Sequence, residues 1–282
     1  MTYRSLVVAS LLFLSASGAS AQSERITVRL APMPGQVFRM RASQQVAMNG
    51  EPDTAAAGGP AMPALAMSMT LTLEYTMTTS AANEQGRYEA RIVCDSADAT
   101  VLINGQAMPV PFGQTAGQVF TVAYDGSGTP VEITGGSEQG ATATARQFLQ
   151  GLLGQTTPLV LAIGETVTQP MNVALPMPGP VDSTMTIEGR FTLQSVSSAG
   201  GDRIAHLTTT STVAFTPSAP GASPTGMTMG MSGEGTMDVN IDRGFAIASE
   251  QAMTLDGLIT PGSAAPAMRM HGTVKTSNRV IP

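Results

Sequence analysis

Methionine, whose sulfur can bind metal ions, is unusually frequent in this chain. There are 19 methionines among 282 residues, and many of them alternate with polar residues. Thioether sulfur is a soft ligand that selects Cu(I), so clustered methionines beside a histidine are candidates for a copper site. The candidate ligands are Met227, Met229, Met231, Met268, Met270 and His271.

Spacing nevertheless favours packing over copper binding. Alternate residues of a strand lie on one face about 6.5–7 Å apart, so neighbours such as Met227 and Met229 cannot share one ion without a bend. Val239 and Ile241 continue the same face, and methionine fills irregular gaps in apolar cores. We therefore expect these methionines to pack and expect no cofactor. A Met-rich periplasmic Cu(I)-binding module is the alternative.

Hydrolytic chemistry would need a base, and the chain has two histidines, His206 and His271. A serine hydrolase combines a serine, a histidine and an oxyanion hole. No G-x-S-x-G elbow occurs, and Gly126-Ser127-Gly128 is typical of a hairpin turn. We therefore expect a non-enzymatic protein without catalytic residues. An unrecognised hydrolase is the second alternative, which a Ser–His–acid contact in a cleft would favour.

Composition excludes several other classes of function. One cysteine and two histidines cannot form a Cys/His zinc cluster or a disulfide framework. The formal net charge of −6 and only 14 Lys and Arg residues argue against nucleic-acid binding, because phosphate contacts need cations. Charged residues make up 12% of the chain and apolar residues 42%, which indicates a packed core.

Alternation of apolar and polar residues dominates the chain after its first residues. In Met67–Met77 every second residue is apolar, and Met227–Ile241 follows the same rule with glycine at two of those positions. Such segments are typical of antiparallel strands with one buried and one wet face. Turn signals at Asp125–Gly128 and Asp242–Gly244 separate them.

One segment breaks this alternation. From about residue 138 to 153, apolar residues recur at the spacing of an amphipathic helix. We expect this central helix to pack on the sheet and to cover an apolar pocket. Its stripe consists of Ala145, Phe148, Leu149, Leu152 and Leu153, of which Phe148, Leu149, Leu152 and Leu153 are the ligand-pocket candidates.

The segments on either side of the helix look alike. Met69-Thr70-Leu71 aligns with Met185-Thr186-Ile187 at an offset of 116 residues (185 − 69 = 116). We predict a mainly β fold of antiparallel curved sheets, with two similar halves at about 36–135 and 165–280 around the helix. Residues 22–282 would form a single β-rich domain. Whether the halves are a true repeat stays open, since any two amphipathic hairpins align this well.

Turn and packing motifs also carry a family resemblance. They are the hairpin Tyr124–Gly135, the segment Pro158–Thr166, Leu175-Pro176 and the hairpin Ile241–Ile247. With this order the chain resembles a group of uncharacterised secreted or lipid-anchored bacterial β-rich proteins that have a two-part β layout around a central helix. The resemblance covers roughly residues 36–280. It is informative about the fold, and no catalytic residues come with it. This chain lacks the lipoprotein cysteine of that group.

The N-terminus has the pattern of a cleavable secretory signal. Arg4 precedes an apolar run, Leu6–Leu14, and small residues end at Ala21. Cleavage near Ala21 would remove residues 1–21 and leave a periplasmic or extracellular protein. No later segment reaches the roughly 20 apolar residues of a transmembrane helix.

These observations lead to an expected function. We expect an exported, soluble binding or envelope-associated protein whose apolar concave face takes a hydrophobic small molecule or lipid. We expect no nucleic-acid partner and no transmembrane segment in the mature chain. The sequence indicates neither the oligomeric state nor the ligand.

Overall fold

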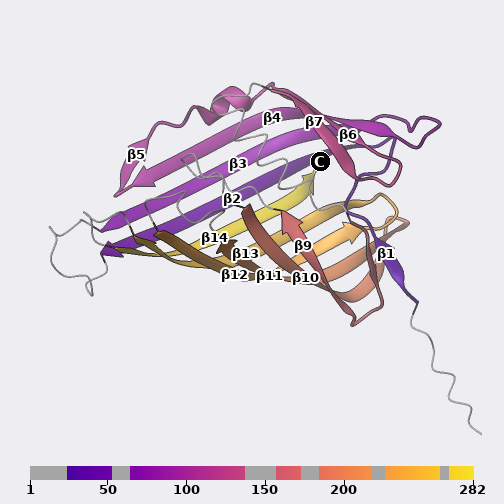
Figure 1. Ribbon diagram of the computed structural model, residues 1–282. Helices are drawn as coiled ribbons and strands as arrows, with labels where there is room; N and C mark the ends of the chain where they lie inside the picture. The colour runs from indigo at the N-terminus through magenta and orange to yellow at the C-terminus, as the bar shows by residue number, and fades with distance from the viewer. Residues whose placement is uncertain (1–23, 53–63, 137–156, 173–183, 217–225, 261–266) are drawn as a thin grey trace, which may run out of the picture.

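The computed structural model describes residues 24–52, 64–136, 157–172, 184–216, 226–260 and 267–282 (Figure 1). The predicted signal peptide, residues 1–21, lies outside them. All pairings of the described strands are antiparallel, so the predicted antiparallel β architecture is confirmed.

Twelve of the described strands form one continuous sheet, and two more form a small second sheet. The short pair is β1 (Ile26–Val28) with β8 (Leu159–Leu161), and β5 (Gln106–Met108) pairs with β4 (Tyr88–Ile103). The spatial order of the large sheet is β7 (Pro130–Gly135), β6 (Val119–Tyr124), β4 (Tyr88–Ile103), β3 (Leu65–Thr79), β2 (Val37–Pro52), β14 (Met268–Ile281), β13 (Phe245–Thr260), β12 (Gly226–Asn240), β11 (Asp202–Thr216), β10 (Thr184–Ala199) and β9 (Thr166–Asn172).

The large sheet consists of two meanders. They are joined by the pairing of its first strand in chain order, β2, with its last, β14. Strand β2 pairs with β14 over 14 residue pairs, from Met268↔Pro52 to Ile281↔Arg39. The N-terminal and C-terminal parts of the chain therefore meet in the middle of the sheet, while β7 and β9 form its ends. Figure 1 shows the indigo to purple strands β2–β4 as one leaf and the orange to yellow strands β10–β14 as the other.

Alternation along the strands gives the sheet an apolar face and a polar face. In β3 the side chains of Leu71, Leu73, Tyr75 and Met77 are buried, whereas the threonines between them are more exposed. Successive side chains of a strand point to opposite faces, so the apolar residues of neighbouring strands meet on one side. We refer below to these two sides as the apolar face and the polar face.

The prediction of a fold with a central amphipathic helix is wrong for the part of the chain that the structure describes. That part contains no α-helix, and its one helical element is the 3-10 helix η2, Pro111–Thr115. The two meanders are joined by direct strand pairing between β2 and β14, so they need no helix between them. Residues 138–153, where the helix was predicted, lie outside the described part. No helix within it could span a membrane.

The apolar face near β2, β3, β4 and β6 carries an aromatic cluster. The rings of Phe38 and Phe245 stack with centroids 4.3 Å apart, and those of Tyr88 and Tyr124 stack at 4.9 Å. Burying such large side chains stabilises the fold by about 1.5–3 kcal/mol each. The aromatic cluster consists of Phe38, Tyr75, Tyr88, Phe112, Phe120, Tyr124 and Phe245, with Met40, Met77, Ile92 and Cys94 among them.

The apolar face of β10–β14, together with the part of β2 that contains Met48, carries a second core, which we call the methionine cluster. Val28 of β1 and Leu159 and Leu161 of β8 pack against it and are fully buried. Several of its methionines remain partly exposed. The methionine cluster consists of Met48, Met231, Met237, Met253, Met268 and Met270, with Leu207, Val213, Leu255 and Val274.

In each half, a glycine that precedes a strand of the large sheet donates a similar backbone hydrogen bond. Gly35 N–H donates to Ser80 O at 3.0 Å before β2, and Gly164 N–H donates to Leu193 O at 2.7 Å before β9. In each half a short strand, β1 or β8, precedes this glycine, and the two short strands pair with each other. This correspondence supports the predicted repeat, which stays a prediction.

Candidate functional site

Polar side chains interrupt the apolar face between the two clusters. Strand register places Gln44, Thr276, Gln251, Gly235 and Thr209 in one row across β2, β14, β13, β12 and β11. Adjacent rows add three more polar residues on the same face. We call this set the polar patch: Gln44, Thr209, Ser211, Ser249, Gln251, Thr276 and Asn278.

Hydrogen bonds satisfy only part of the polar patch. Gln251 Nε2 donates to Ser211 Oγ at 2.6 Å. Asn278 Oδ1 is buried and has no hydrogen-bond partner. Burial raises the pKa of the neighbouring Tyr75 hydroxyl, and a hydrogen bond donated to the Tyr75 oxygen by the amide nitrogen of Asn278 lowers it. This bond does not involve Oδ1. Buried polar atoms without a partner are rare in native proteins, so the Asn278 carbonyl is a candidate contact for a ligand.

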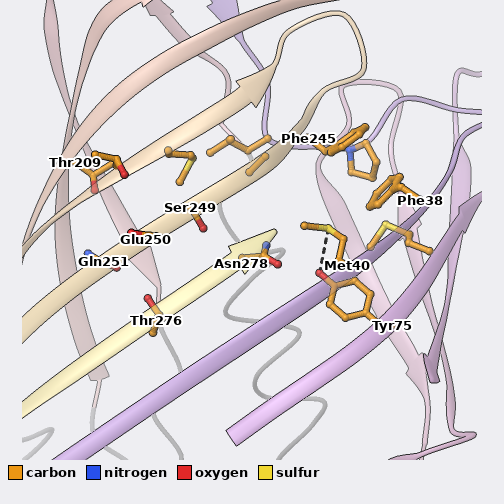
Figure 2. A pocket seen from close by; sticks show the side chains of 16 residues that line it. Phe38, Met40, Tyr75, Thr209, Phe245, Ser249, Glu250, Gln251, Thr276 and Asn278 are labelled. Atoms are coloured by element: carbon orange, nitrogen blue, oxygen red, sulfur yellow. Dashed lines mark hydrogen bonds between the residues drawn. The ribbon is translucent and has the colours of Figure 1, made fainter. Parts of the chain in front are cut away.

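A cavity of about 150 Å³ lies on the apolar face where the polar patch meets the aromatic cluster (Figure 2). Asn278, Ser249 and Thr276 line its polar side, and Met40, Tyr75 and Phe245 line its apolar side in the same view. The Tyr75 hydroxyl donates to Met40 Sδ at 3.5 Å. Leu30 and Pro32, which connect β1 to β2, border the cavity as well.

The methionine cluster continues the apolar face beyond this cavity, and its side chains lie over glycines. A Cβ placed on Gly50 would lie 2.7 Å from Met268 Sδ and 2.9 Å from Met270 Sδ. A Cβ on Gly233 would clash with Ala252 O and with Met253 Cγ. Glycine therefore provides the room that these flexible side chains occupy. Methionine surfaces of this kind adapt to ligands of different shapes.

Two wider hollows lie along the polar face. One, of about 790 Å³, is bordered by Ser43, Gln45, Glu234, Glu250 and Lys275, and a neighbouring one measures about 510 Å³. The polar face is thus hollowed more broadly than the apolar face, where the sequence led us to expect the concavity. Of the charged residues that border these hollows, Glu234, Glu250 and Lys275 are exposed to solvent.

Three side chains of the polar face form a Ser–His–Asp hydrogen-bond chain. Ser197 Oγ lies 2.8 Å from His206 Nε2, and His206 Nδ1 lies 2.8 Å from Asp238 Oδ1. With the proton on Nδ1, the imidazole could accept a proton from the serine. The His206 and Asp238 side chains are 37% and 39% exposed, and none of the three residues lines the hollows described above.

The structure separates one candidate copper ligand, His271, from the described methionines among the candidates. Met231, Met268 and Met270 lie on the apolar face, whereas His271 is exposed on the polar face, where Nδ1 lies 2.6 Å from Asp256 Oδ1. Adjacent residues of a strand point to opposite faces, so His271 does not join the sulfurs. The side chains of Met227 and Met229 lie outside the described part. Among the described residues no group of three or more His, Cys, Asp or Glu could hold a metal ion.

The pocket candidates Phe148, Leu149, Leu152 and Leu153 all lie outside the described residues, so they stay predictions. Sequence reasoning missed the polar patch. Its signal was a polar residue at an apolar-face position, such as Gln44 after Phe38, Met40 and Ala42. Cys94 is buried, and burial raises the pKa of its thiol to about 11, so this thiol is unsuited to nucleophilic chemistry at neutral pH.

Comparisons with known proteins bear on the fold. No protein-family model and no curated protein matches the chain. A lipovitellin structure described for its lipid–protein interactions matches 89% of this chain at 10% identity, with a TM-score of 0.50. The match covers 25% of the lipovitellin chain, so this chain spans about a quarter of that protein's length.

A second solved structure, an outer membrane channel from Pseudomonas putida F1, matches 90% of this chain and 98% of its own at 9% identity. Its TM-score of 0.20 is too low to indicate a common fold. The chain is therefore similar in fold to a part of the lipovitellin chain alone.

Proposed function

We propose that this protein binds a lipid-like amphiphile on the apolar face of its large sheet and that it acts without catalysis. The observation that carries this proposal is the cavity of about 150 Å³, where the uncharged polar patch meets methionine and aromatic side chains. Ligand sites are typically apolar with a few convergent polar groups, as this cavity is.

The apolar face next to the cavity offers a surface along which the apolar chain of a ligand could lie. From Gln44 to Gly50, strand β2 advances about 20 Å at roughly 3.3 Å per residue. Along this path the apolar face carries Val46 and Met48, both partly exposed, beside Met253 and Met268 of β13 and β14. An acyl chain lying there would cover apolar surface that now faces solvent in part.

The comparison with lipovitellin supports the proposal at the level of fold. That protein is described for its lipid–protein interactions, and the match spans 89% of this chain. Shared architecture does not transfer a ligand, so the argument for binding rests on the cavity.

The test is the uptake of diphenylhexatriene, an uncharged probe that fluoresces in apolar surroundings. We expect the wild type to bind it and Ser249→Phe to lose most binding, because the new ring would fill the cavity. Ala252→Phe is the matched control on the same strand, since Ala252 borders the polar hollow instead. Loss of binding in Ala252→Phe alone would assign the site to the polar face and contradict the proposal. Thermal melts of both variants establish that each is folded.

A second candidate function is ester hydrolysis, which the Ser197–His206–Asp238 chain favours. Ser197 Oγ would attack an acyl carbon and pass its proton through His206 to the leaving alcohol, and water would then release the acid. The test is hydrolysis of p-nitrophenyl butyrate by wild type, Ser197→Ala and Ser195→Ala. Ser195 is the register partner of His206 and serves as control. Equal rates for all three proteins would exclude this function.

A further inference from the structure

The polar side of the cavity is built from uncharged groups. Amides of Gln251 and Asn278 and hydroxyls of Thr209, Ser249 and Thr276 line it. In β2, β13 and β14 no described residue on the apolar face is charged. Glu250 also borders the cavity, but its register with Ser277 places it on the polar face, and it is exposed.

This arrangement disfavours a charged head group. A carboxylate, phosphate or ammonium that entered the cavity would lose hydration and meet no opposite charge there. Burying an unpaired charge costs far more than burying a neutral polar group that is hydrogen-bonded. The charged side chains of this region instead stand on the polar face, as the ion pairs of Glu74 with Arg39 and Arg41 illustrate.

One buried atom indicates which neutral group fits. Asn278 Oδ1 accepts no hydrogen bond in the structure, and the Tyr75 hydroxyl beside it is directed to Met40 Sδ. A ligand that donates a hydrogen bond would satisfy this carbonyl. An ester or ketone, which only accepts, would not.

Size restricts the cavity to the head group. The cavity of about 150 Å³ has the volume of one that holds a molecule the size of benzene, so a whole lipid does not fit inside it. The remainder of the ligand would lie along the methionine cluster, which continues the apolar face.

From these observations, and resting on the proposed lipid-like ligand, we infer that the cavity selects an uncharged, hydrogen-bond-donating head group, such as the hydroxyl of a long-chain alcohol or a monoacylglycerol, in contact with Asn278. Fatty acid anions and charged phospholipids are poor ligands on this account.

The test is displacement of diphenylhexatriene from the wild type at neutral pH by three ligands with one chain length: dodecan-1-ol, dodecanoate and dodecyltrimethylammonium. We expect the alcohol to bind at least about tenfold more tightly than either ion, because only the ions must lose charge hydration. Equal or tighter binding of either ion would overturn the inference while leaving the proposed function intact. A wild type that takes up no diphenylhexatriene would overturn both.

A variant then tests the contact itself. Asn278→Leu keeps a similar volume but removes the acceptor. We therefore expect the affinity for dodecan-1-ol to fall about fivefold relative to the affinity for diphenylhexatriene, which has no group that donates a hydrogen bond. Ser277→Leu, its exposed neighbour on the polar face, is the control and should change neither. Unchanged alcohol affinity in Asn278→Leu would show that this carbonyl does not contact the ligand. If that variant fails to fold, the ligand series on the wild type still decides the selectivity.

Discussion

The aromatic cluster and the methionine cluster lie on the same face of one sheet, yet they are built differently. In the aromatic cluster, rings stack in pairs, and Phe120, Ile92 and Cys94 are completely buried. In the methionine cluster, flexible side chains lie over glycines and several remain partly exposed. Stiff, buried rings specify one packing, whereas methionine accepts several. The difference indicates that the first region maintains the fold and that the second is suited to binding.

The polar patch lies at the boundary between these regions. Its position follows from register, since Gln44, Thr276 and Gln251 come from three strands and align only when β2 pairs with β14. The cavity thus lies where the rigid aromatic cluster, the adaptable methionine cluster and the uncharged polar patch meet. This juxtaposition is the basis of the proposed ligand class.

The largest contrast should come from truncating one side chain in each cluster. Phe120→Ala should lower the free energy of unfolding by about 3–5 kcal/mol, because it empties a fully buried site. Met253→Ala should cost about 1 kcal/mol, since this side chain is partly exposed and flexible neighbours can fill its space. Urea denaturation measures both values. Similar losses in the two variants would break the distinction between the clusters.

A glycine substitution should have the next largest effect. Gly233→Val should destabilise the protein by about 1–3 kcal/mol, because its Cβ would collide with Ala252 O and displace Met253. Gly230→Val, on the polar face of the same strand, is the control. There a Cβ would have Asp256 O at 4.0 Å as its nearest neighbour. If both variants melt at the wild-type temperature, the methionines do not depend on the space above glycine.

Oxidation should distinguish the clusters by accessibility. Dilute hydrogen peroxide should convert Met48, Met253 and Met268 to sulfoxides several-fold faster than Met40 and Met77, which are only 4% and 1% exposed. Peptide mass spectrometry over time measures the order. A bound amphiphile should slow the oxidation of the first group alone. Uniform rates would contradict the difference in packing.

The smallest effect concerns the thiol of the aromatic cluster. Burial raises the pKa of Cys94 from 9.0 to about 11, so the folded protein should resist iodoacetamide at neutral pH. Above about pH 9 the unfolded thiol ionises while the folded one stays protonated, so stability should decrease as the pH rises towards 11. The Cys94→Ala variant should lose less stability over this interval. Rapid labelling of the native protein would show that Cys94 is accessible.

Local patterns predicted the strands better than their arrangement. Alternation in Met67–Met77 corresponds to β3, and the turn at Asp125–Gly128 joins β6 to β7. The pairing of β2 with β14 joins residues more than 200 positions apart in the chain, for example Gln44 and Thr276. No local pattern encodes such a contact. The apolar stripe at 138–153 added a central helix to the predicted β fold, and the described residues contain no α-helix.

The candidate site also depends on strand pairing that local sequence patterns do not encode. Gln44 breaks the apolar alternation of its strand and could have been singled out, but its alignment with Gln251 depends on the register of two strand pairs. The contact of Ser197 with His206 depends on a register shift between Leu193 and Ser195. A shift of one residue moves every side chain to the other face, so such contacts cannot be read from spacing.

Native mass spectrometry of the protein purified from cells without detergent tests the central claim most directly. The account predicts an adduct with the mass of an uncharged lipid on the wild type and on Ala252→Phe, and its loss from Ser249→Phe. Bare polypeptide in all three samples, together with no uptake of diphenylhexatriene by the wild type, would contradict ligand binding on the apolar face.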